Sequence, residues 1–469
     1  MSLKTRRIIF ILFIIIFIII TPLIISYASG YRFSFPRKII QKTGLLVLDS
    51  RPPGAKIYIN DKLYQLFFNK YFSNKNNYTT TPAKIKGILP NEYNVRLELG
   101  GYWPWQKKIK ISGGGSEYYD EIILFKKDLP SLVNKDDARQ ISVSPDKKFS
   151  VAIKDNNEIN FINLITGEKN NFTLNSISSP YSSTTQPANF TILWPASGQR
   201  VLIGDEIVAL PGFKILINLN KFIQPDASGI QWSLTDENII YYKNKNGIFN
   251  FNLSNNKIKT ILNFKLNGLI GQNNYNSFLI KNNNIFLINQ ADKSSSLDIY
   301  ELNSNNFFKS IKLPYCPECN FINFKNKYIN IYNDDNKILY IIDPLSTSYF
   351  PVKKDISNIW YFDWIDDDKL LYANEFEIWI ADIYNNTENL LTRISEPIKA
   401  ILWHPAKYII YATDNKINLL EMELDNKRNN IELIDFKNIS SIYLNAVGDI
   451  LYFYTGTGAQ KELYKLNIL

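Results

Sequence analysis

Beyond about residue 136 the chain repeats one short unit, and this repetition limits its fold more than any other feature of the sequence. In each unit an aromatic or aliphatic residue is followed by a polar turn. A hydrophobic run typical of a β-strand begins six to eight residues after the start. Four units start with tryptophan, at Trp194, Trp232, Trp364 and Trp403. The other four start at Val143, Ile270, Ile322 and Leu444.

The spacing of these starts predicts the fold. Successive starts lie 38 to 52 residues apart, near the ~40 to 45 residues of a four-stranded propeller blade. Such blades cannot bury both faces alone, so they stack radially. We therefore predict a β-propeller over residues 128–469, with eight blades, or seven if the units at Ile270 and Ile322 merge. The last unit lacks one clear strand, and we expect a segment near Leu129 to Val133 to supply it and close the ring.

Two of the turns carry a resemblance to known proteins. Ser144-Pro145-Asp146 and Trp403-His404-Pro405 resemble the turns of TolB-type and WD-type propellers, and the likeness covers roughly residues 136 to 469. It implies a fold but no particular activity, because propellers host many unrelated functions.

A second, smaller β domain is expected over residues 44–127, where short apolar runs alternate with turns. The ordered motifs Pro53-Gly54-Ala55, Thr81-Pro82 and Gly101-Tyr102 resemble the PEGA domain, a small β-sandwich of envelope and surface proteins. Two features depart from that family: Pro52-Pro53 replaces its Pro-Glu pair, and residues 63 to 78 form an insertion. The resemblance implies a non-enzymatic module that binds or supports surface structures. We also expect Gly113-Gly114-Gly115 to form a hairpin turn between two strands.

The N-terminus has the pattern of a membrane anchor. Lys4, Arg6 and Arg7 precede an apolar stretch over residues 8–25, and eighteen residues span roughly 27 Å, close to a bilayer core of about 30 Å. We predict a cytoplasmic tail and transmembrane signal-anchor helix over residues 1–29, with the lipid bilayer as its partner, and a juxtamembrane linker over 30–43. A cleaved signal peptide is the alternative, because Ser26-Tyr27-Ala28 offers small residues for cleavage.

The short basic tail favours a cytoplasmic N-terminus and an extracytoplasmic bulk. Basic residues after the helix oppose this orientation, namely Arg32, Arg37, Lys38 and Lys42. A seven-residue basic tail is nevertheless hard to translocate, whereas large downstream domains cross largely regardless of charge. We therefore predict a single-pass protein of the bacterial cell membrane with its C-terminus outside.

One histidine and two cysteines leave little room for metal or redox chemistry. A zinc site usually needs three or four such ligands, so Cys316-Pro317-Glu318-Cys319 has only His404 as a further candidate. A redox dithiol would need a thioredoxin-like setting that is not visible. We favour a disulfide between Cys316 and Cys319 if the region is extracytoplasmic, with free thiols as the alternative. No cofactor or metal is predicted.

Three further features have ordinary structural interpretations. We interpret His404 as a turn residue beside Trp403, and Asp366-Asp367-Asp368 with Asp363 as a solvated turn rather than a calcium loop. Trp103 and Trp105 are expected in the core of the smaller domain, with an exposed sugar-stacking pair as the alternative.

The function that follows is a membrane-anchored extracytoplasmic binding or scaffold protein, without enzymatic activity. We expect the propeller face to bind an envelope protein, peptide or glycan. The net charge of +9 is scattered along the chain, so no nucleic acid is expected. The alternative function is an envelope glycan hydrolase or lyase that uses a carboxylate pair on the propeller face.

Overall fold

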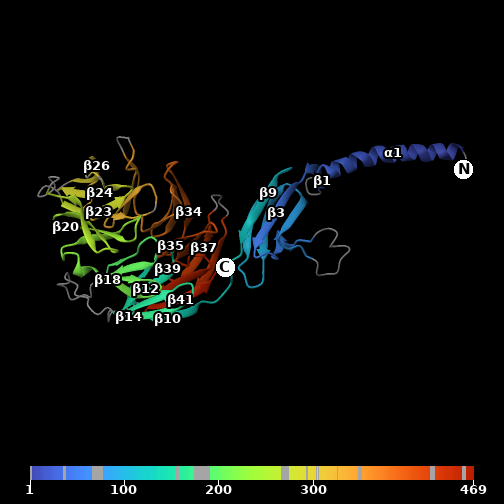
Figure 1. The fold of residues 1–469 in the computed structure, drawn as a ribbon. Helices are drawn as coiled ribbons and strands as arrows, with labels where there is room; N and C mark the ends of the chain where they lie inside the picture. Colours follow the sequence, from blue (N-terminus) through green and yellow to red (C-terminus); the bar gives the residue numbers. More distant parts are fainter. Residues whose placement is uncertain are drawn as a thin grey trace. The chain divides into compact units, whose positions relative to one another are not determined.

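The fold is described from a computed structural model (Figure 1). The residues that the structure describes are 3–34, 38–65, 78–136, 138–154, 158–173, 191–265, 274–291, 294–302, 304, 306–324, 326–346, 351–422, 428–456 and 461–469. The predicted start at Ile270 and most of the insertion at 63 to 78 lie outside them. The chain divides into two compact units, one comprising Met1–Leu129, Leu419–Ile431 and Asn467–Leu469, the other Pro130–Asn418 and Glu432–Leu466.

A single helix, α1 (Leu3–Ala28), begins the first unit. Its residues 8–25 are apolar apart from Thr21, and none of the helix's side chains is buried. The helix is therefore long and apolar enough to cross a membrane, a property that a signal sequence near an N-terminus shares. It contains the residues 8–25 predicted to enter the bilayer. A two-stranded sheet of β1 (Tyr31–Ser34) and β2 (Ile39–Lys42) follows within the predicted linker.

Two sheets then form a β-sandwich, as predicted. One sheet has the order β6 (Ala83–Ile88), β3 (Gly44–Arg51), β9 (Ser116–Ile123). The other has the order β5 (Lys62–Leu63), β4 (Lys56–Ile59), β7 (Asn91–Glu98), β8 (Trp105–Ile111). Every second residue of β8 is buried, because alternate side chains of a strand point to opposite faces. Leu46 and Trp105 meet in the core between the sheets.

The hairpin expected across Gly113-Gly114-Gly115 is wrong. Strand β9 pairs in parallel with β3 and belongs to the other sheet from β8, so these glycines carry the chain from one sheet to the other. Gly114 has a φ of +77°, which favours glycine. A Cβ atom on Gly113 would also lie 3.0 Å from the Lys42 carbonyl oxygen. The short crossing is thus possible because these positions lack side chains.

The second unit is a β-propeller whose four-stranded sheets follow one another along the chain (Figure 1). The sheets are β11 to β14 (Ala138–Val143, Phe149–Lys154, Glu158–Asn163, Lys169–Thr173), β15 to β18 (Ile192–Leu193, Arg200–Ile203, Glu206–Ala209, Lys214–Asn218), β19 to β22 (Ser228–Trp232, Ile239–Asn244, Gly247–Asn252, Lys257–Asn263), β23 to β26 (Asn274–Lys281, Asn284–Ala291, Ser294–Glu301, Phe307–Leu313), β27 to β30 (Cys319–Ile322, Ile329–Asn333, Ile338–Ile342, Val352–Ile356), β31 to β34 (Tyr361–Trp364, Lys369–Ala373, Glu377–Asp382, Thr387–Arg393) and β35 to β38 (Ala400–His404, Tyr408–Ala412, Lys416–Glu421, Asn430–Asp435).

The last sheet joins both ends of the propeller sequence. It contains β39 (Ile439–Leu444), β40 (Ile450–Thr455) and β41 (Lys461–Asn467), and its fourth strand is β10 (Ser131–Asp136). Strand β10 pairs antiparallel with β41. The predicted closure is thus confirmed, although the strand begins at Ser131 rather than Leu129. Within the described residues the propeller has eight four-stranded sheets, equal to the number of predicted starts; the blade number itself stays a prediction.

The hydrophobic cores of the propeller lie between blades. Val151 of β12 shares one cluster of buried residues with Val201 of β16. Ile288 of β24 likewise shares a cluster with Ile331 of β28. Because each blade buries its faces against its neighbours, the radial stacking inferred from the repeat is the packing that the structure has.

Candidate binding face

The two ends of the propeller differ in the kind of loop they carry. In every blade the first strand leads into a turn at one end, and the second strand returns to the other end. We call the first end the turn face; it includes residues 144–148, 233–238 and 365–368. We call the second end the connection face; it carries the links between blades, such as residues 314–318 and 357–360.

Lys281 joins two blades at the turn face. It ends β23, and its Nζ donates to the carbonyl oxygens of Phe324 and Tyr328 in the next blade, at 2.8 Å each. The side chain also lies 3.3 Å from Oδ1 of Asn326. Burial lowers the pKa of Lys281 to about 8. This lysine therefore contributes to the blade junction rather than to a free surface.

Acidic residues of the turns make similar junctions. Asp368 accepts from the Tyr328 hydroxyl and from Nζ of Lys327, both at 2.7 Å and both from the preceding blade. These two donors hold the pKa of Asp368 below its usual value. Glu237 accepts from the amide and hydroxyl of Ser197 in the preceding blade, at 2.8 and 2.6 Å. These two carboxylates are thus satisfied by neighbouring blades.

His404 has the structural role expected for it. Its side chain is buried, and Nδ1 accepts from the Ala406 amide at 3.1 Å. Because Nδ1 is the acceptor, Nε2 must carry the proton of the neutral ring, and it donates to the Gly448 carbonyl oxygen at 2.7 Å. Burial lowers the pKa of His404, and Lys147 lowers it further. The neutral ring joins its blade to the next one.

Asp363 does not belong to the turn of Asp366-Asp367-Asp368, with which it was grouped from the sequence. Asp366 accepts the amides of Asp368 and Lys369, as in a polar turn. Asp363 instead lies in β31 and is desolvated, which raises its pKa. Lys147 and the amides of Trp364 and Trp403 oppose that rise. The interpretation as one solvated turn is therefore wrong for Asp363.

The tryptophans at the starts of the units lie at the inner strands and contact neighbouring blades. Nε1 of Trp194 donates to the Ser142 hydroxyl at 2.9 Å, and Nε1 of Trp232 donates to the Leu193 carbonyl oxygen at 3.0 Å. Trp364 stacks on Tyr328 with ring centroids 5.9 Å apart. Trp403 is half-buried in β35. Sequence reasoning found these residues through their period but assigned them no partner.

Two of the three motifs of the smaller domain, Pro53-Gly54-Ala55 and Thr81-Pro82, contact each other. The Gly54 amide donates to the Thr81 carbonyl oxygen at 2.8 Å, and the Ala55 amide donates to the Thr81 hydroxyl at 3.0 Å. Pro53 and Pro82 flank these contacts in sequence. At the other motif the Lys127 amide donates to the Gly101 carbonyl oxygen at 2.9 Å, and Tyr102 forms a bridge with Lys126.

Of Trp103 and Trp105 in the smaller domain, only Trp105 is fully buried in the core. Trp105 is buried, as expected, while Trp103 is half-buried. Nζ of Lys127 lies 4.7 Å from the centre of a Trp103 ring, within range of a cation–π contact. We therefore find no exposed pair of tryptophans at these two positions.

The connection face carries exposed aromatic side chains. These are Phe222, Tyr315, Trp360 and Phe376. Trp360 immediately precedes β31, and Phe376 lies in the turn between β32 and β33 of the same blade. The Trp360 amide donates to the Ala373 carbonyl oxygen, which places the two aromatic residues at one end of this blade. Exposed aromatic residues are enriched where proteins bind partners.

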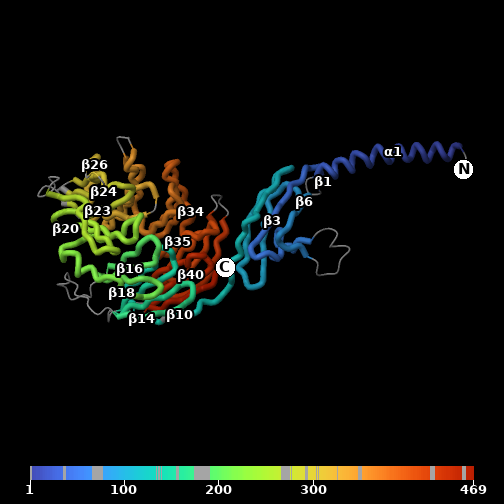
Figure 2. The backbone as a smooth tube through the Cα atoms, viewed as in Figure 1, coloured from blue at the N-terminus to red at the C-terminus, as the bar shows by residue number. Residues whose placement is uncertain are grey.

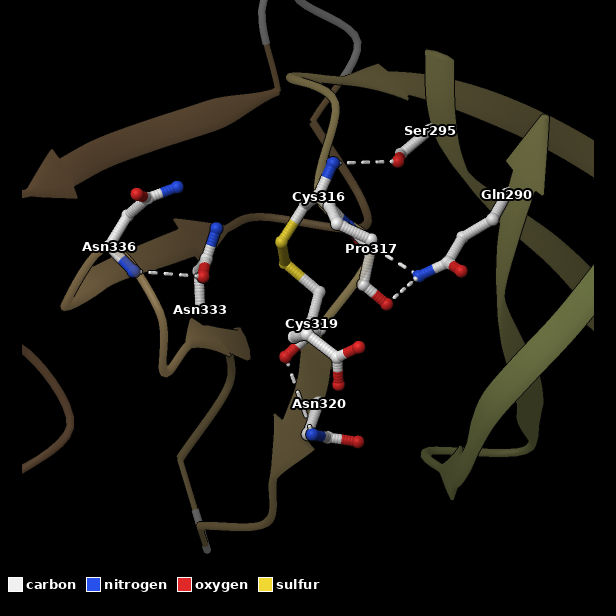
Figure 3. The surroundings of a disulfide bond; sticks show 9 residues. Gln290, Ser295, Cys316, Pro317, Cys319, Asn320, Asn333 and Asn336 are labelled. Atoms are coloured by element: carbon white, nitrogen blue, oxygen red, sulfur yellow. Dashed lines mark hydrogen bonds between the residues drawn. A yellow bond between two sulfur atoms is a disulfide. The ribbon is translucent and has the colours of Figure 1, made fainter. Parts of the chain in front are cut away.

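Cys316 and Cys319 form a disulfide (Figure 3), and Tyr315 directly precedes Cys316 in the sequence. Both cysteines are buried in the core shared by two blades. In Figure 3, Gln290 reaches from the neighbouring blade and donates to the carbonyl oxygens of Cys316 and Pro317, at 2.9 and 2.6 Å. The Cys316 amide donates to the Ser295 hydroxyl at 3.0 Å. These contacts fix the backbone that presents Tyr315 and Glu318.

No group of three or more His, Cys, Asp or Glu side chains with metal-binding geometry occurs in the part of the chain that the structure describes.

No family model matches the sequence, and no curated protein matches it. Among solved structures, the C-terminal WD40 domain of Sif2 is similar over 72% of this chain and 98% of its own, at 13% identity and a TM-score of 0.49. The Dos1 propeller is similar over 73% and 95%, at 11% identity and a TM-score of 0.48. A eukaryotic initiation factor is similar over 70% and 85%, at 13% identity and a TM-score of 0.48. We base the propeller assignment on the sheet topology and draw no functional conclusion from these similarities.

Proposed function

We propose that this chain is a membrane-anchored binding or scaffold protein of a bacterial cell envelope, whose connection face binds a protein, peptide or glycan. The single observation that supports it most is α1, whose apolar side chains are all unburied. A helix of this composition is stable in a bilayer and unfavourable in water. The resemblance of the smaller domain to PEGA supports the envelope location.

The connection face is the better candidate for binding because several charged groups of the turn face are used between blades. Lys281, Glu237 and Asp368 each bind an adjacent blade. Tyr315, Trp360 and Phe376 instead expose aromatic surface on neighbouring blades. Partly exposed aromatic residues of this kind are typical centres of binding energy in interfaces.

We infer a role without catalysis. The alternative enzyme would need two carboxyl groups about 5 to 9.5 Å apart in an open cleft. Asp363, the desolvated carboxyl group of an inner strand, is contacted by backbone amides of Trp364 and Trp403. These contacts are those of a structural carboxyl group, so they give the alternative no support.

Membrane extraction tests the anchor. The full chain should remain in the membrane pellet after washing with alkaline carbonate, whereas a chain lacking residues 1–29 should be released. Release of the full chain would contradict the proposal.

Affinity capture tests the binding face. The full chain, solubilised in detergent, serves as bait for solubilised envelope, alongside a Tyr315→Ala, Trp360→Ala, Phe376→Ala triple variant. Tyr384→Ala is the matched control, since Tyr384 is exposed in the turn between β33 and β34 at the other end of the propeller. We expect a specific partner with the wild type and the control but at least a tenfold loss with the triple variant. Equal capture by all three would contradict this choice of face.

A further inference from the structure

The two-stranded sheet of β1 and β2 lies directly after the membrane helix. Only Ser29 and Gly30 separate the end of α1 from the start of β1. In Figure 2 the chain passes from α1 into β1 without an intervening domain. Two residues of extended chain reach only about 7 Å, so a helix in the bilayer keeps this sheet near the lipid headgroups.

The junction between helix and sheet is ordered by specific contacts. The Arg32 guanidinium donates to the Tyr27 carbonyl oxygen in the last turn of α1 at 2.8 Å, and its centre lies 3.4 Å from the centre of the Tyr27 ring. A cation is stabilised there because the C-terminal end of a helix carries partial negative charge. The Thr43 amide and hydroxyl both donate to the Gly30 carbonyl oxygen, at 2.9 and 2.7 Å. These bonds connect both ends of the hairpin to the helix end.

The two faces of this hairpin differ. Tyr31 pairs with Lys42 and Phe33 pairs with Ile40, so these four side chains share one face. Three of them are apolar or aromatic and yet exposed, with Tyr31 at 41%, Phe33 at 50% and Ile40 at 64%. On the opposite face Ser34 is buried and Arg32 and Gln41 are half-buried, while Ile39 is exposed. An exposed apolar face this close to the end of a membrane helix is typical of a segment that inserts at the interface.

The charge of the segment has one sign. Arg32, Arg37, Lys38 and Lys42 are its ionisable cations, and the first acidic residue of the whole chain is Asp49. Basic residues beside a membrane helix are attracted to anionic lipid headgroups. The positions that oppose the predicted orientation thus have another explanation, since they complement the membrane surface on which they would lie.

We propose that the β1–β2 hairpin binds the membrane surface, and we call it the foot. The face that carries Tyr31, Phe33 and Ile40 enters the bilayer interface, and the lysines of the hairpin bind anionic phospholipid headgroups. The proposal rests on the proposed membrane anchor. The foot holds the chain against the membrane at a fixed point, beyond what the helix alone provides.

Spin labels in the full chain test this proposal. Single cysteines replace Phe33 or Ile40 in a Cys316→Ser, Cys319→Ser background, and the labelled protein is reconstituted in vesicles of phosphatidylcholine and phosphatidylglycerol at 3:1. Collision with oxygen, which concentrates in lipid, is compared with collision with a water-soluble nickel chelate. We expect oxygen collisions to exceed nickel collisions several-fold at both positions. Lys38→Glu with Lys42→Glu should reduce that ratio at least twofold in these vesicles but not in pure phosphatidylcholine.

Two control labels separate the possible failures. Ile16→Cys reports the anchor, and Tyr118→Cys reports an exposed position of β9 in the sandwich. If the label at 16 is in lipid while those at 33 and 40 match the one at 118, the foot is overturned and the anchor stands. If the label at 16 is in water, the proposed anchor is overturned and the foot with it. An equal ratio with and without the lysine substitutions would overturn the headgroup contact.

Discussion

The protonation state of His404 links one residue to the stability of the propeller. Its ring is neutral because Nδ1 accepts from the Ala406 amide and burial disfavours the charged form. In the unfolded chain the ring takes up a proton near pH 6.5, but in the folded chain it does so only at lower pH. Below pH 6.5 the unfolded state therefore binds more protons, and the free energy of unfolding falls. Above that pH both states are neutral, so His404 causes no change.

We expect the melting temperature of the full chain in detergent to fall from pH 7 to pH 5 by more than that of His404→Gln. The chain has a single histidine, so the difference between the two profiles isolates this ring from the carboxyl groups, which titrate in both proteins. Parallel profiles would show that His404 does not couple to unfolding.

Asp298 is a buried acceptor that the sequence did not identify. It accepts from Tyr275 and Asn289 at 3.2 Å each, and from Ser296 and Ser310 at 3.1 and 2.5 Å. Asp298→Leu removes the acceptor and leaves buried donors unpaired, which costs about 3 kcal/mol or more. Asp298→Asn keeps one carbonyl oxygen and should cost about half as much. Thermal or denaturant unfolding measures both, and equal losses would contradict this role.

Residue roles were predictable where neighbours in sequence decide them. His404 stands between Trp403 and Pro405, which already indicated a turn. Most partners of Lys281 and Asp298 could not be found in this way, because they lie 9 to 47 residues away along the chain. The sequence around Lys281 does not show that carbonyl groups of the next blade will accept hydrogen bonds from its side chain.

At the scale of elements, β10 contributes to closure from outside the repeat. It pairs with β41 from Ser131 opposite Lys465 to Asp136 opposite Lys461, and Nζ of Lys135 lies 3.2 Å from a Glu462 carboxyl oxygen. Replacing residues 131–136 by glycine and serine of equal length keeps the connection but weakens the pairing. We expect the propeller to lose about 3 to 5 kcal/mol, from several backbone hydrogen bonds of about 1 kcal/mol each.

The melting temperature should therefore fall by several degrees, and light scattering should show association, because the edge of β41 is exposed. Leu129→Ser is the control, since Leu129 lies before the strand and is 84% exposed; it should melt like the wild type. An unchanged melting temperature of the glycine and serine variant would contradict a stabilising role for β10.

Elements with a clear period were predicted well, and their pairing was predicted less well. The alternation in β8 follows directly from the apolar positions of Trp105, Ile109 and Ile111. The parallel pairing of β9 with β3 was missed, because a glycine-rich link between two strands is typical of both a hairpin and a crossing between sheets. Local sequence does not distinguish them; the deciding contacts join Leu45 to Ser116, far apart in the chain.

At the scale of the whole molecule, the orientation in the membrane and the state of the two cysteines are one question. Cys316 and Cys319 form a disulfide, and such bonds persist outside the cytoplasm but are reduced inside it. Cells are lysed with a maleimide in denaturant, and the full chain is analysed by mass. We expect no adduct at either cysteine before reduction and one at each after it. Cys316→Ser is the control, because the single Cys319 should react without reductant.

A reporter active only in the cytoplasm, fused after Leu469, should remain silent. Adducts at both wild-type cysteines before reduction, or a strong reporter signal, would overturn the extracytoplasmic placement, because the first requires a reducing compartment and the second requires the C-terminus inside.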